Sequence, residues 1–129
     1  MSKKSRGINA ERDLIHKFWA AGWAAMRSAG SGSSHYPSPD VIASNNLRKI
    51  AIEAKLTTEE KKYFDKKEIE DLKIFADKFG AESWVAIKFF RKDWVFLTLE
   101  DLEATGKHFV ATKEVAERRG LSFNEITAL

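Results

Sequence analysis

Two acids and a lysine occupy closely spaced positions in two short apolar stretches of this chain. Asp40 directly precedes the stretch Val-Ile-Ala, and a polar Ser-Asn-Asn turn separates it from a second stretch that ends at Glu53, Ala54 and Lys55. β-Branched residues on both sides of an Asn-rich turn predict two paired strands. Because successive side chains of a strand point to opposite faces, Glu53 and Lys55 share one face, and hairpin pairing brings Asp40 close to them.

Carboxylates and an ammonium in this arrangement suit the metal-dependent hydrolysis of a phosphodiester. Mg²⁺ takes oxygen ligands in octahedral geometry, keeps several of its waters, and lowers the pKa of a water that becomes the nucleophile. Lys55 would orient that water or offset the charge that builds on the phosphate. A plainer interpretation also fits, because a Glu-x-Lys pair is common on a solvent-facing strand and Pro-Asp is an ordinary opening of a turn. The rest of the chain has to decide between the two.

Composition limits the other kinds of chemistry. The 129 residues include no cysteine, which excludes disulfides and thiolate metal sites and favours a reducing, intracellular setting. His16, His35 and His108 lie far apart without the spacing of metal ligands, so we expect no zinc site. No apolar run approaches the roughly 18 residues of a membrane span, and the start lacks the apolar core of a signal peptide. We expect a soluble cytoplasmic protein with one domain over residues 1–129.

Charge is distributed unevenly along the chain. Residues 1–64 carry 11 Lys and Arg against 6 Asp and Glu, whereas residues 65–129 carry 11 against 13. The basic half contains the acidic cluster, an arrangement that would draw a polyanion toward a metal site. The first six residues are expected to form a flexible basic tail that reaches along a phosphate backbone. The basic residues of this tail are Lys3, Lys4 and Arg6.

A helix is predicted from residue 7 to the region of Gly22, because apolar side chains recur there at helical spacing. Glu11 falls on the apolar stripe of this helix, where an unpaired acid is costly to bury. Two explanations fit. Glu11 pairs with a metal ion or with the Lys55 ammonium, or it lies at the edge of the stripe near the helix start, where the helix dipole favours an acid.

Strand and helix patterns alternate along the rest of the chain. The sequence predicts a strand at 23–27, a Gly- and Ser-rich loop at 28–34, and a helix at 67–79 that ends at Gly80. It predicts an exposed connection at 56–67, with a short strand at Tyr63 as the alternative. It then predicts a hairpin of strands at 83–90 and 94–99, a helical turn at 100–104, and short helices at 112–119 and from Ser122 onward. These elements predict an α/β fold, with a mixed sheet of about five strands and helices on its faces.

Five blocks of sequence extend the evidence beyond the Glu-x-Lys pair. The blocks are Gly7-x-x-x-Glu11-Arg12-x-Leu14, Met26-Arg27-Ser28-Ala29-Gly30-Ser31, Pro39-Asp40-Val41-Ile42-Ala43, Ile52-Glu53-Ala54-Lys55 and Phe75-Ala76-x-x-Phe79-Gly80. Their order and spacing resemble the archaeal Holliday junction resolvases of the restriction-endonuclease-like superfamily. The resemblance covers roughly residues 4–99, and the end from residue 105 carries little of it. It implies a homodimer that binds four-way DNA junctions and nicks two opposing strands with Mg²⁺, with Mn²⁺ as the alternative ion.

The resemblance also implies a role for individual positions. Asp40, Glu53 and the Ala54 carbonyl match metal-binding positions, Lys55 matches the catalytic lysine, and Glu11 matches the essential acid of the first helix, which we count with the metal-binding acids. Arg27 and Ser31 match positions that serve cleavage through phosphate contact, and Arg12 matches one that contacts DNA. Phe75 and Phe79 resemble the aromatic pair at the dimer contact, which would explain the surplus of aromatic residues in that helix.

Two other functions are compatible with the same residues. One is a metal-dependent nuclease of the same fold that cuts flaps, mismatched duplex or duplex of a given sequence; cleavage of a junction compared with linear DNA would separate it from a resolvase. The other is a nucleic-acid-binding module without catalysis. An intact set of Glu11, Asp40, Glu53 and Lys55 argues against that module.

Overall fold

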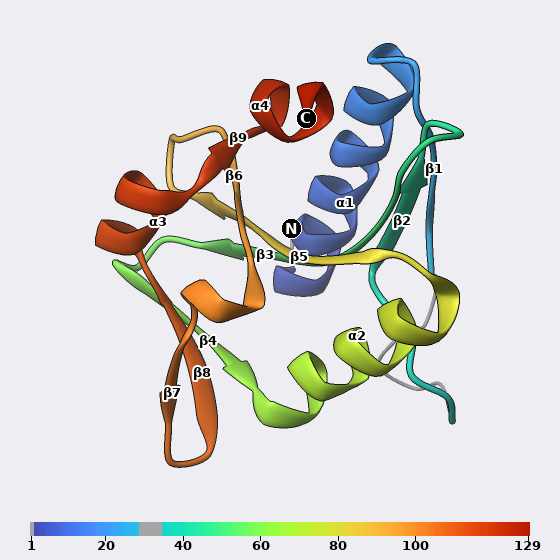
Figure 1. Cartoon of the computed structure of the whole chain (residues 1–129). Coiled ribbons are helices and arrows are strands. Elements are labelled where there is room, and N and C mark those ends of the chain that lie inside the picture. Colours follow the sequence, from blue (N-terminus) through green and yellow to red (C-terminus); the bar gives the residue numbers. More distant parts are fainter. Residues whose placement is uncertain (1, 29–34) are drawn as a thin grey trace.

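The computed structural model describes residues 2–28 and 35–129 (Figure 1). The first part of the chain forms α1 (Lys3–Ala20), β1 (Ala24–Arg27), β2 (Val41–Ser44), β3 (Lys49–Thr57), β4 (Lys61–Asp65) and α2 (Lys66–Phe79). The second part forms β5 (Glu82–Phe89), β6 (Trp94–Leu97), η2 (Leu99–Asp101), β7 (Glu103–Thr105), β8 (His108–Thr112), α3 (Lys113–Arg119), β9 (Leu121–Ser122) and α4 (Phe123–Ala128).

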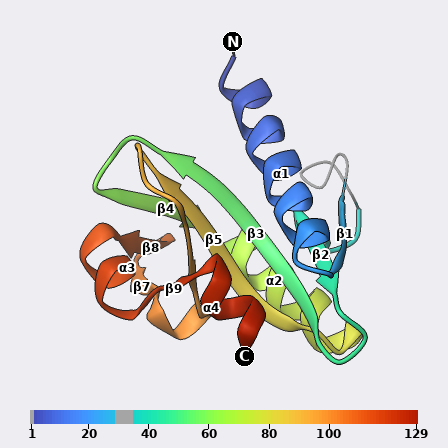
Figure 2. The ribbon, with the colours of Figure 1, turned by 90° about the horizontal axis from the view of Figure 1, so that it is seen from above.

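The main sheet of the described residues has six strands in the order β1-β2-β3-β5-β6-β9. β3 and β5 are parallel and lie side by side through the middle of the molecule (Figure 2), whereas the other neighbours are antiparallel. The predicted mixed α/β sheet is therefore confirmed. It has one strand more than the five expected, because the two-residue strand β9 is too short to show a strand pattern in the sequence.

The two faces of β3 carry different cores. Ile50 and Ile52 point to one face, where they belong to an apolar cluster with Phe18 of α1. Ala51 points to the opposite face, in a cluster with Leu72 of α2. This alternation confirms the predicted period of two residues. It also places α1 and α2 against opposite faces of the sheet, so side chains from both helices reach β3.

The hairpin between β2 and β3 forms as the sequence predicts. The backbone N–H of Asn45 donates to the Arg48 carbonyl at 3.1 Å, and the Asn45 side chain accepts from the Arg48 N–H at 2.8 Å. Asn46 has a φ of 80°, a left-handed conformation that Asn tolerates better than most residues. The turn sets the register in which Val41 lies opposite Ile52, and this register brings the start of β2 beside the acidic end of β3.

The first helix begins earlier than predicted. Ser2 caps it by accepting a hydrogen bond from the N–H of Ser5 at 3.0 Å, so Lys3, Lys4 and Arg6 lie in helical turns. The expectation of a flexible basic tail is wrong for these residues. Lysines at a helix N-terminus oppose the helix dipole, but a serine cap and the packing of the rest of the helix outweigh that cost.

A second sheet, with the order β4-β8-β7, was not predicted. The connection expected at 56–67 contains β4, and the helical turn expected at 100–104 is limited to η2, after which β7 begins. β4 pairs with β8 through residues far apart in the sequence. Phe64 and Ala111 of this sheet are buried in the same apolar cluster as Leu72 of α2. The hairpin of β7 and β8 projects from the rest of the molecule (Figure 1).

Glycines end two of the predicted helices, for different reasons. α2 ends at Gly80, whose φ of 78° is the left-handed cap conformation. α3 ends before Gly120, where a Cβ atom would collide with the Val95 side chain and the Ala116 carbonyl oxygen. No helix in the described ranges is long and apolar enough to cross a membrane.

Arg48 connects the β2–β3 hairpin to the C-terminal helix. Its guanidinium donates two hydrogen bonds of 2.8 Å to the Glu82 carboxylate and a third, of 2.7 Å, to the Ile126 carbonyl. The guanidinium also lies 5.4 Å from the centre of the Trp23 ring. Bidentate arginine–carboxylate pairs are among the stronger side-chain interactions, so Arg48 stabilises the end of the sheet opposite the acids.

We predict that Arg48→Ala lowers the free energy of unfolding by roughly 2–3 kcal/mol, because three charge-assisted hydrogen bonds and a ring contact are lost together. Urea unfolding followed by tryptophan fluorescence measures this change. Arg119→Ala is the matched control, since Arg119 is exposed and lies 3.7 Å from its nearest carboxylate, Asp101. The control should change the free energy by less than about 0.5 kcal/mol. Equal losses in the two variants would contradict the prediction.

Candidate active site

Asp40 lies where the chain enters β2. Its backbone N–H donates to the Ile52 carbonyl at 3.0 Å, which is the last backbone bond between the two strands at this end. Its side chain accepts a hydrogen bond from the Ala54 N–H at 2.9 Å. The Asp40 carboxylate therefore takes the place of the next backbone acceptor beside β3. Asp40 is 8% exposed. The buried position of this acid therefore follows from the strand pairing.

Glu53 and Lys55 lie on one face of β3, as predicted. The Lys55 Nζ is 3.8 Å from a Glu53 carboxylate oxygen, and Glu53 is only 7% exposed. Burial raises the pKa of Glu53 to about 9; the nearby Asp40 charge adds to this increase, and Lys55 opposes it. Asp40 and Glu53 thus lie close enough for their charges to interact strongly. A cation at this position would relieve both the desolvation and the repulsion.

Glu11 contacts Arg27 of β1. The Arg27 Nε donates to a Glu11 carboxylate oxygen at 3.0 Å, and the pair is largely buried. Burial raises the pKa of Glu11, the Arg27 hydrogen bond opposes that effect, and the charge of Asp40 adds to it. The helix-start explanation of Glu11 is wrong, because α1 begins at Lys3. The sequence had suggested a metal ion or Lys55 as the partner of Glu11 and did not identify Arg27.

Glu68, in the first turn of α2, is a residue that the sequence reasoning missed. One of its carboxylate oxygens accepts a hydrogen bond from the Lys55 Nζ at 2.7 Å. Burial alone would lower the pKa of Lys55, but this bond and the charges of Glu68, Glu53 and Asp40 raise it, so Lys55 stays protonated. The signal that could have identified Glu68 is the Asp-x-x-Glu spacing from Asp65, which is typical of a capping box at a helix start.

The other predicted residues lie elsewhere on α1 and α2 or outside the described residues. The predicted DNA contacts of α1 are all exposed; they are Lys3, Lys4, Arg6 and Arg12. Phe75 and Phe79 stack on α2 with ring centres 5.0 Å apart, and Phe79 is 47% exposed. Ser31 lies outside the described residues, as does the Gly- and Ser-rich loop beyond Ser28.

The donor atoms of the acidic cluster fit a hard cation. Within residues 2–28 and 35–129, no three Asp, Glu, His or Cys side chains already stand in the arrangement of a metal site. The available donors are nevertheless carboxylate oxygens, which suit Mg²⁺ or Mn²⁺. The Ala54 carbonyl is a further candidate, because the N–H and C=O of a strand residue point to the same side, and the Ala54 N–H faces Asp40.

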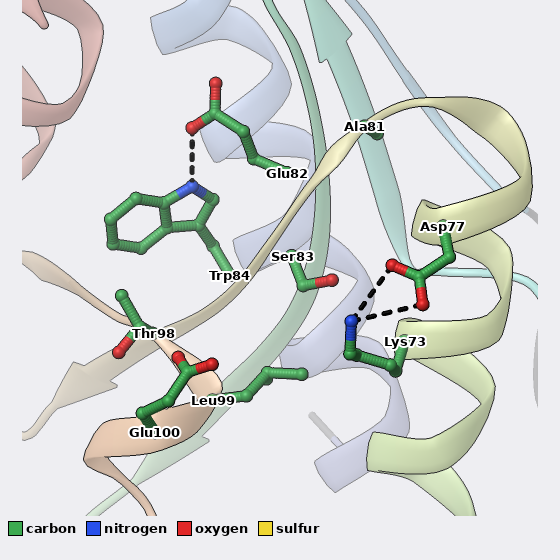
Figure 3. A pocket seen from close by; sticks show the side chains of 9 residues that line it. All are labelled: Lys73, Asp77, Ala81, Glu82, Ser83, Trp84, Thr98, Leu99 and Glu100. Carbon is green, nitrogen blue, oxygen red and sulfur yellow. Dashed lines mark hydrogen bonds and ion pairs between the residues drawn. The ribbon is translucent and has the colours of Figure 1, made fainter.

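A surface pocket of about 320 Å³ is lined by residues of α2, β5 and η2 and of the segments next to them (Figure 3). The residues that line it are Lys73, Asp77, Ala81, Glu82, Ser83, Trp84, Thr98, Leu99 and Glu100. Its polar side chains include the ion pair of Lys73 with Asp77 and the hydrogen bond from the Trp84 indole to Glu82. The pocket includes none of the candidate site residues, and DNA is too large to enter it, so we place the reaction at the acidic cluster.

Comparisons with known proteins agree with this architecture. Residues 2–129 match the family described as archaeal Holliday junction resolvase (Hjc). Crossover junction endodeoxyribonuclease Hjc of Archaeoglobus fulgidus is 43% identical over 95% of each chain. Crossover junction endodeoxyribonuclease Hjc of Sulfolobus acidocaldarius is 35% identical over 98% of this chain and 89% of its own length.

The solved structure of Archaeoglobus fulgidus Hjc, a Holliday junction resolvase from an archaeal hyperthermophile, superimposes with a TM-score of 0.87. The two chains are 42% identical, and the match covers 93% of this chain and 97% of that one. The fold is therefore restriction-endonuclease-like, as predicted. This chain belongs to the archaeal Holliday junction resolvase family.

The raised pKa of Glu53 leads to a prediction about stability. Between about pH 4.5 and 9, Glu53 is ionised in the unfolded chain but protonated in the folded protein. The folded state then binds more protons, so the free energy of unfolding decreases as the pH rises through this range. Glu53→Gln removes this contribution. The variant should therefore gain stability relative to the original protein as the pH rises, by at most roughly 1.4 kcal/mol per pH unit.

Urea unfolding of metal-free protein near pH 5, 7 and 9 measures this difference. Glu59→Gln serves as the control, because Glu59 is exposed in the turn between β3 and β4. Curves of stability against pH that run parallel for the original protein and Glu53→Gln would show that Glu53 ionises normally in the folded state.

Proposed function

We propose that this protein is a structure-specific endodeoxyribonuclease that resolves four-way DNA junctions by paired, metal-dependent cleavage. The observation that carries the proposal is the pair of buried acids, Asp40 and Glu53, beside Lys55 in a chain of the resolvase family. Burying two carboxyl groups side by side costs free energy, and a bound cation would offset that cost. The lack of cysteine is consistent with action in a reducing cytoplasm.

Asp40, Glu53, the Ala54 carbonyl and Glu11 are the proposed ligands of the metal. All four groups offer oxygen atoms, which favours Mg²⁺, with Mn²⁺ as the alternative. When bound, such an ion neutralises charge on the scissile phosphate and makes a water molecule more acidic. The hydrogen bond from the Ala54 N–H holds the Asp40 carboxylate in position beside Glu53.

Lys55 is the proposed catalytic lysine. Its ammonium group lies on the same strand face as Glu53 and stays protonated, so it offers positive charge and N–H donors to a phosphate oxygen or to the attacking water. Arg27, which contacts Glu11, is the proposed phosphate contact beside the acids. We retain Ser31 as a proposed cleavage residue on the resemblance alone.

The DNA-binding surface is proposed to include the basic side chains of α1. This helix carries Glu11 in its third turn, so a backbone that follows the helix would reach the acids. The proposed contacts are Lys3, Lys4, Arg6, Arg12 and Arg27, together with Ser31. Such contacts act on phosphates and do not read bases, which is consistent with recognition of the shape of the junction.

A symmetric homodimer would supply the two sites that paired cleavage requires. The proposed contact is the stacked pair of Phe75 and Phe79, with Ile74 beside them on α2. Phe79 and Ile74 are 47% and 44% exposed, an apolar area that a second copy would cover. The Lys49 ammonium lies 5.6 Å from the Phe79 ring centre, at the edge of this face.

We predict that Asp40→Asn lowers junction cleavage at least about 100-fold while leaving junction binding without metal within roughly threefold, because the amide cannot replace a charged metal ligand. Single-turnover cleavage of a synthetic mobile junction with Mg²⁺ measures the rate, and gel retardation measures binding. Asp93→Asn, at the exposed turn after β5, is the matched control. Unchanged cleavage by Asp40→Asn would overturn the site, and equal cleavage of a linear duplex of the same sequence would overturn the substrate.

We predict that the double variant Phe75→Ala/Phe79→Ala sediments as a monomer of about 14.7 kDa, because the stacked rings supply most of the apolar contact. On a supercoiled plasmid with an extruded cruciform, the monomer should give nicked circles where the dimer gives linear DNA. Phe90→Ala is the control, since Phe90 is exposed to 61% on a different element. A double variant that remains dimeric would place the interface elsewhere.

A further inference from the structure

The carboxylate of Glu68 joins two parts of the fold. One oxygen accepts a hydrogen bond from the Lys55 Nζ at 2.7 Å, and the other accepts one from the backbone N–H of Asp65 at 3.0 Å. Asp65 is the N-cap of α2, and Glu68 is the third residue of that helix, so the second bond belongs to a capping box. A single side chain therefore both caps the helix and holds the proposed catalytic lysine.

Lys55 has two carboxylates within reach, and the distances are unequal. Its ammonium is 2.7 Å from Glu68 but 3.8 Å from Glu53. Lysine carries its charge on a long, flexible stem, so the position of the ammonium depends on the strongest acceptor nearby. Without Glu68, Glu53 would be the nearest remaining acceptor, and the ammonium, already 3.8 Å from it, would move closer. The oxygens of Glu53 would then be occupied by Lys55 at the place where the proposed metal binds.

Glu68 is itself held in one place. Leu72 and Ile69, its neighbours on α2, are buried against the sheet, so the first turn of the helix stays close to β3. The bond to the Asp65 N–H restrains the carboxylate further, and an acid in the first turn is favoured by the helix dipole. The side chain of Glu68 is 30% exposed, so a phosphate approaching Lys55 would meet this pair at the surface.

We propose that Glu68 is a positioning residue for the reaction: it keeps the Lys55 ammonium directed away from Glu53, so that the lysine is free to act on the phosphate or the water. This inference rests on the proposed function, in which Lys55 serves catalysis. Glu68 acts through Lys55 and needs no contact with DNA or metal. Its role differs from that of a helix cap, and the two roles can be separated experimentally.

The matched control for capping is Glu125 of α4. Glu125 occupies the same place in its own capping box, where its carboxylate accepts from the Ser122 N–H at 2.9 Å. No lysine hydrogen bond accompanies that carboxylate among the described contacts. Glu68→Ala and Glu125→Ala therefore remove the same kind of helix cap, and only the first removes an acceptor from Lys55.

The experiment is single-turnover cleavage of a synthetic four-way junction as a function of Mg²⁺ concentration, with the melting temperature of each variant. We expect Glu68→Ala to lower the rate at saturating Mg²⁺ by about 10- to 100-fold, the range seen when a supporting side chain is removed. Glu68→Gln keeps the shape and a neutral acceptor, so its loss should be smaller. Glu125→Ala should lower the melting temperature like Glu68→Ala but leave the rate within about twofold.

A double-mutant cycle makes the test specific. Lys55→Met should abolish most cleavage, and adding Glu68→Ala in that background should change the rate by no more than about twofold, since a positioning residue has nothing left to position. Junction binding without metal should stay within about threefold in all variants. If Glu68→Ala fails to fold, Glu68→Gln supports or overturns the inference by the same cycle.

Three outcomes would overturn the inference. The first is a cleavage rate at saturating Mg²⁺ that is unchanged in Glu68→Ala. The second is a rate in the Lys55→Met/Glu68→Ala double variant that falls by the product of the two single losses. The third is a shift in the Mg²⁺ concentration at half-maximal rate with no change in the saturating rate, which would make Glu68 a metal-facing acid. Asp40→Asn and Lys55→Met are run alongside. If those two variants cleave normally, the proposed site fails; if they are inactive while Glu68→Ala is active, only the role of Glu68 fails.

Discussion

The burial of two acids beside the end of a β-ladder is the constraint on which the rest of this structure depends. Asp40 and Glu53 are removed from water almost completely, and the Lys55 ammonium lies 3.8 Å from a Glu53 carboxylate oxygen. Asp40 is stabilised by the Ala54 N–H, which exists as a free donor only because β2 ends there. The geometry of the acids is thus set by backbone pairing, and the pairing is in turn set by the apolar alternation of β3 and the turn at Asn46.

The two cations near these acids make their shortest contacts with other carboxylates. Arg27 pairs with Glu11, and the nearest acceptor of Lys55 is Glu68. Positive charge therefore lies close to the cluster, although its shortest contacts are with Glu11 and Glu68. A bound cation would add to this charge and offset the cost of burying Asp40 and Glu53.

The parts of the fold that sequence could predict are those governed by local patterns. The strands around Asp40 and Glu53, their shared turn, and the helix that ends at Gly80 follow from alternation, turn chemistry and helical spacing. The small sheet of β4, β8 and β7 could not be predicted, because its pairing joins Phe64 to Phe109 across the sequence and its short strands carry no clear alternation. Within the site, the positions of the acids were predictable. The sequence could not show that Arg27 contacts Glu11 or that Glu68 contacts Lys55, because tertiary packing alone decides which charged side chains meet.

The capping box of α2 has a consequence for how the protein responds to heat. Helix termini unravel before helix centres, and such local openings require far less free energy than unfolding of the whole domain. In this molecule the first turn of α2 contains the carboxylate that holds Lys55. A rise in temperature that only loosens this turn would release the lysine while the sheet and both apolar clusters remain intact. The upper temperature limit of catalysis would then be set by a single helical turn, well below the temperature at which the fold itself is lost.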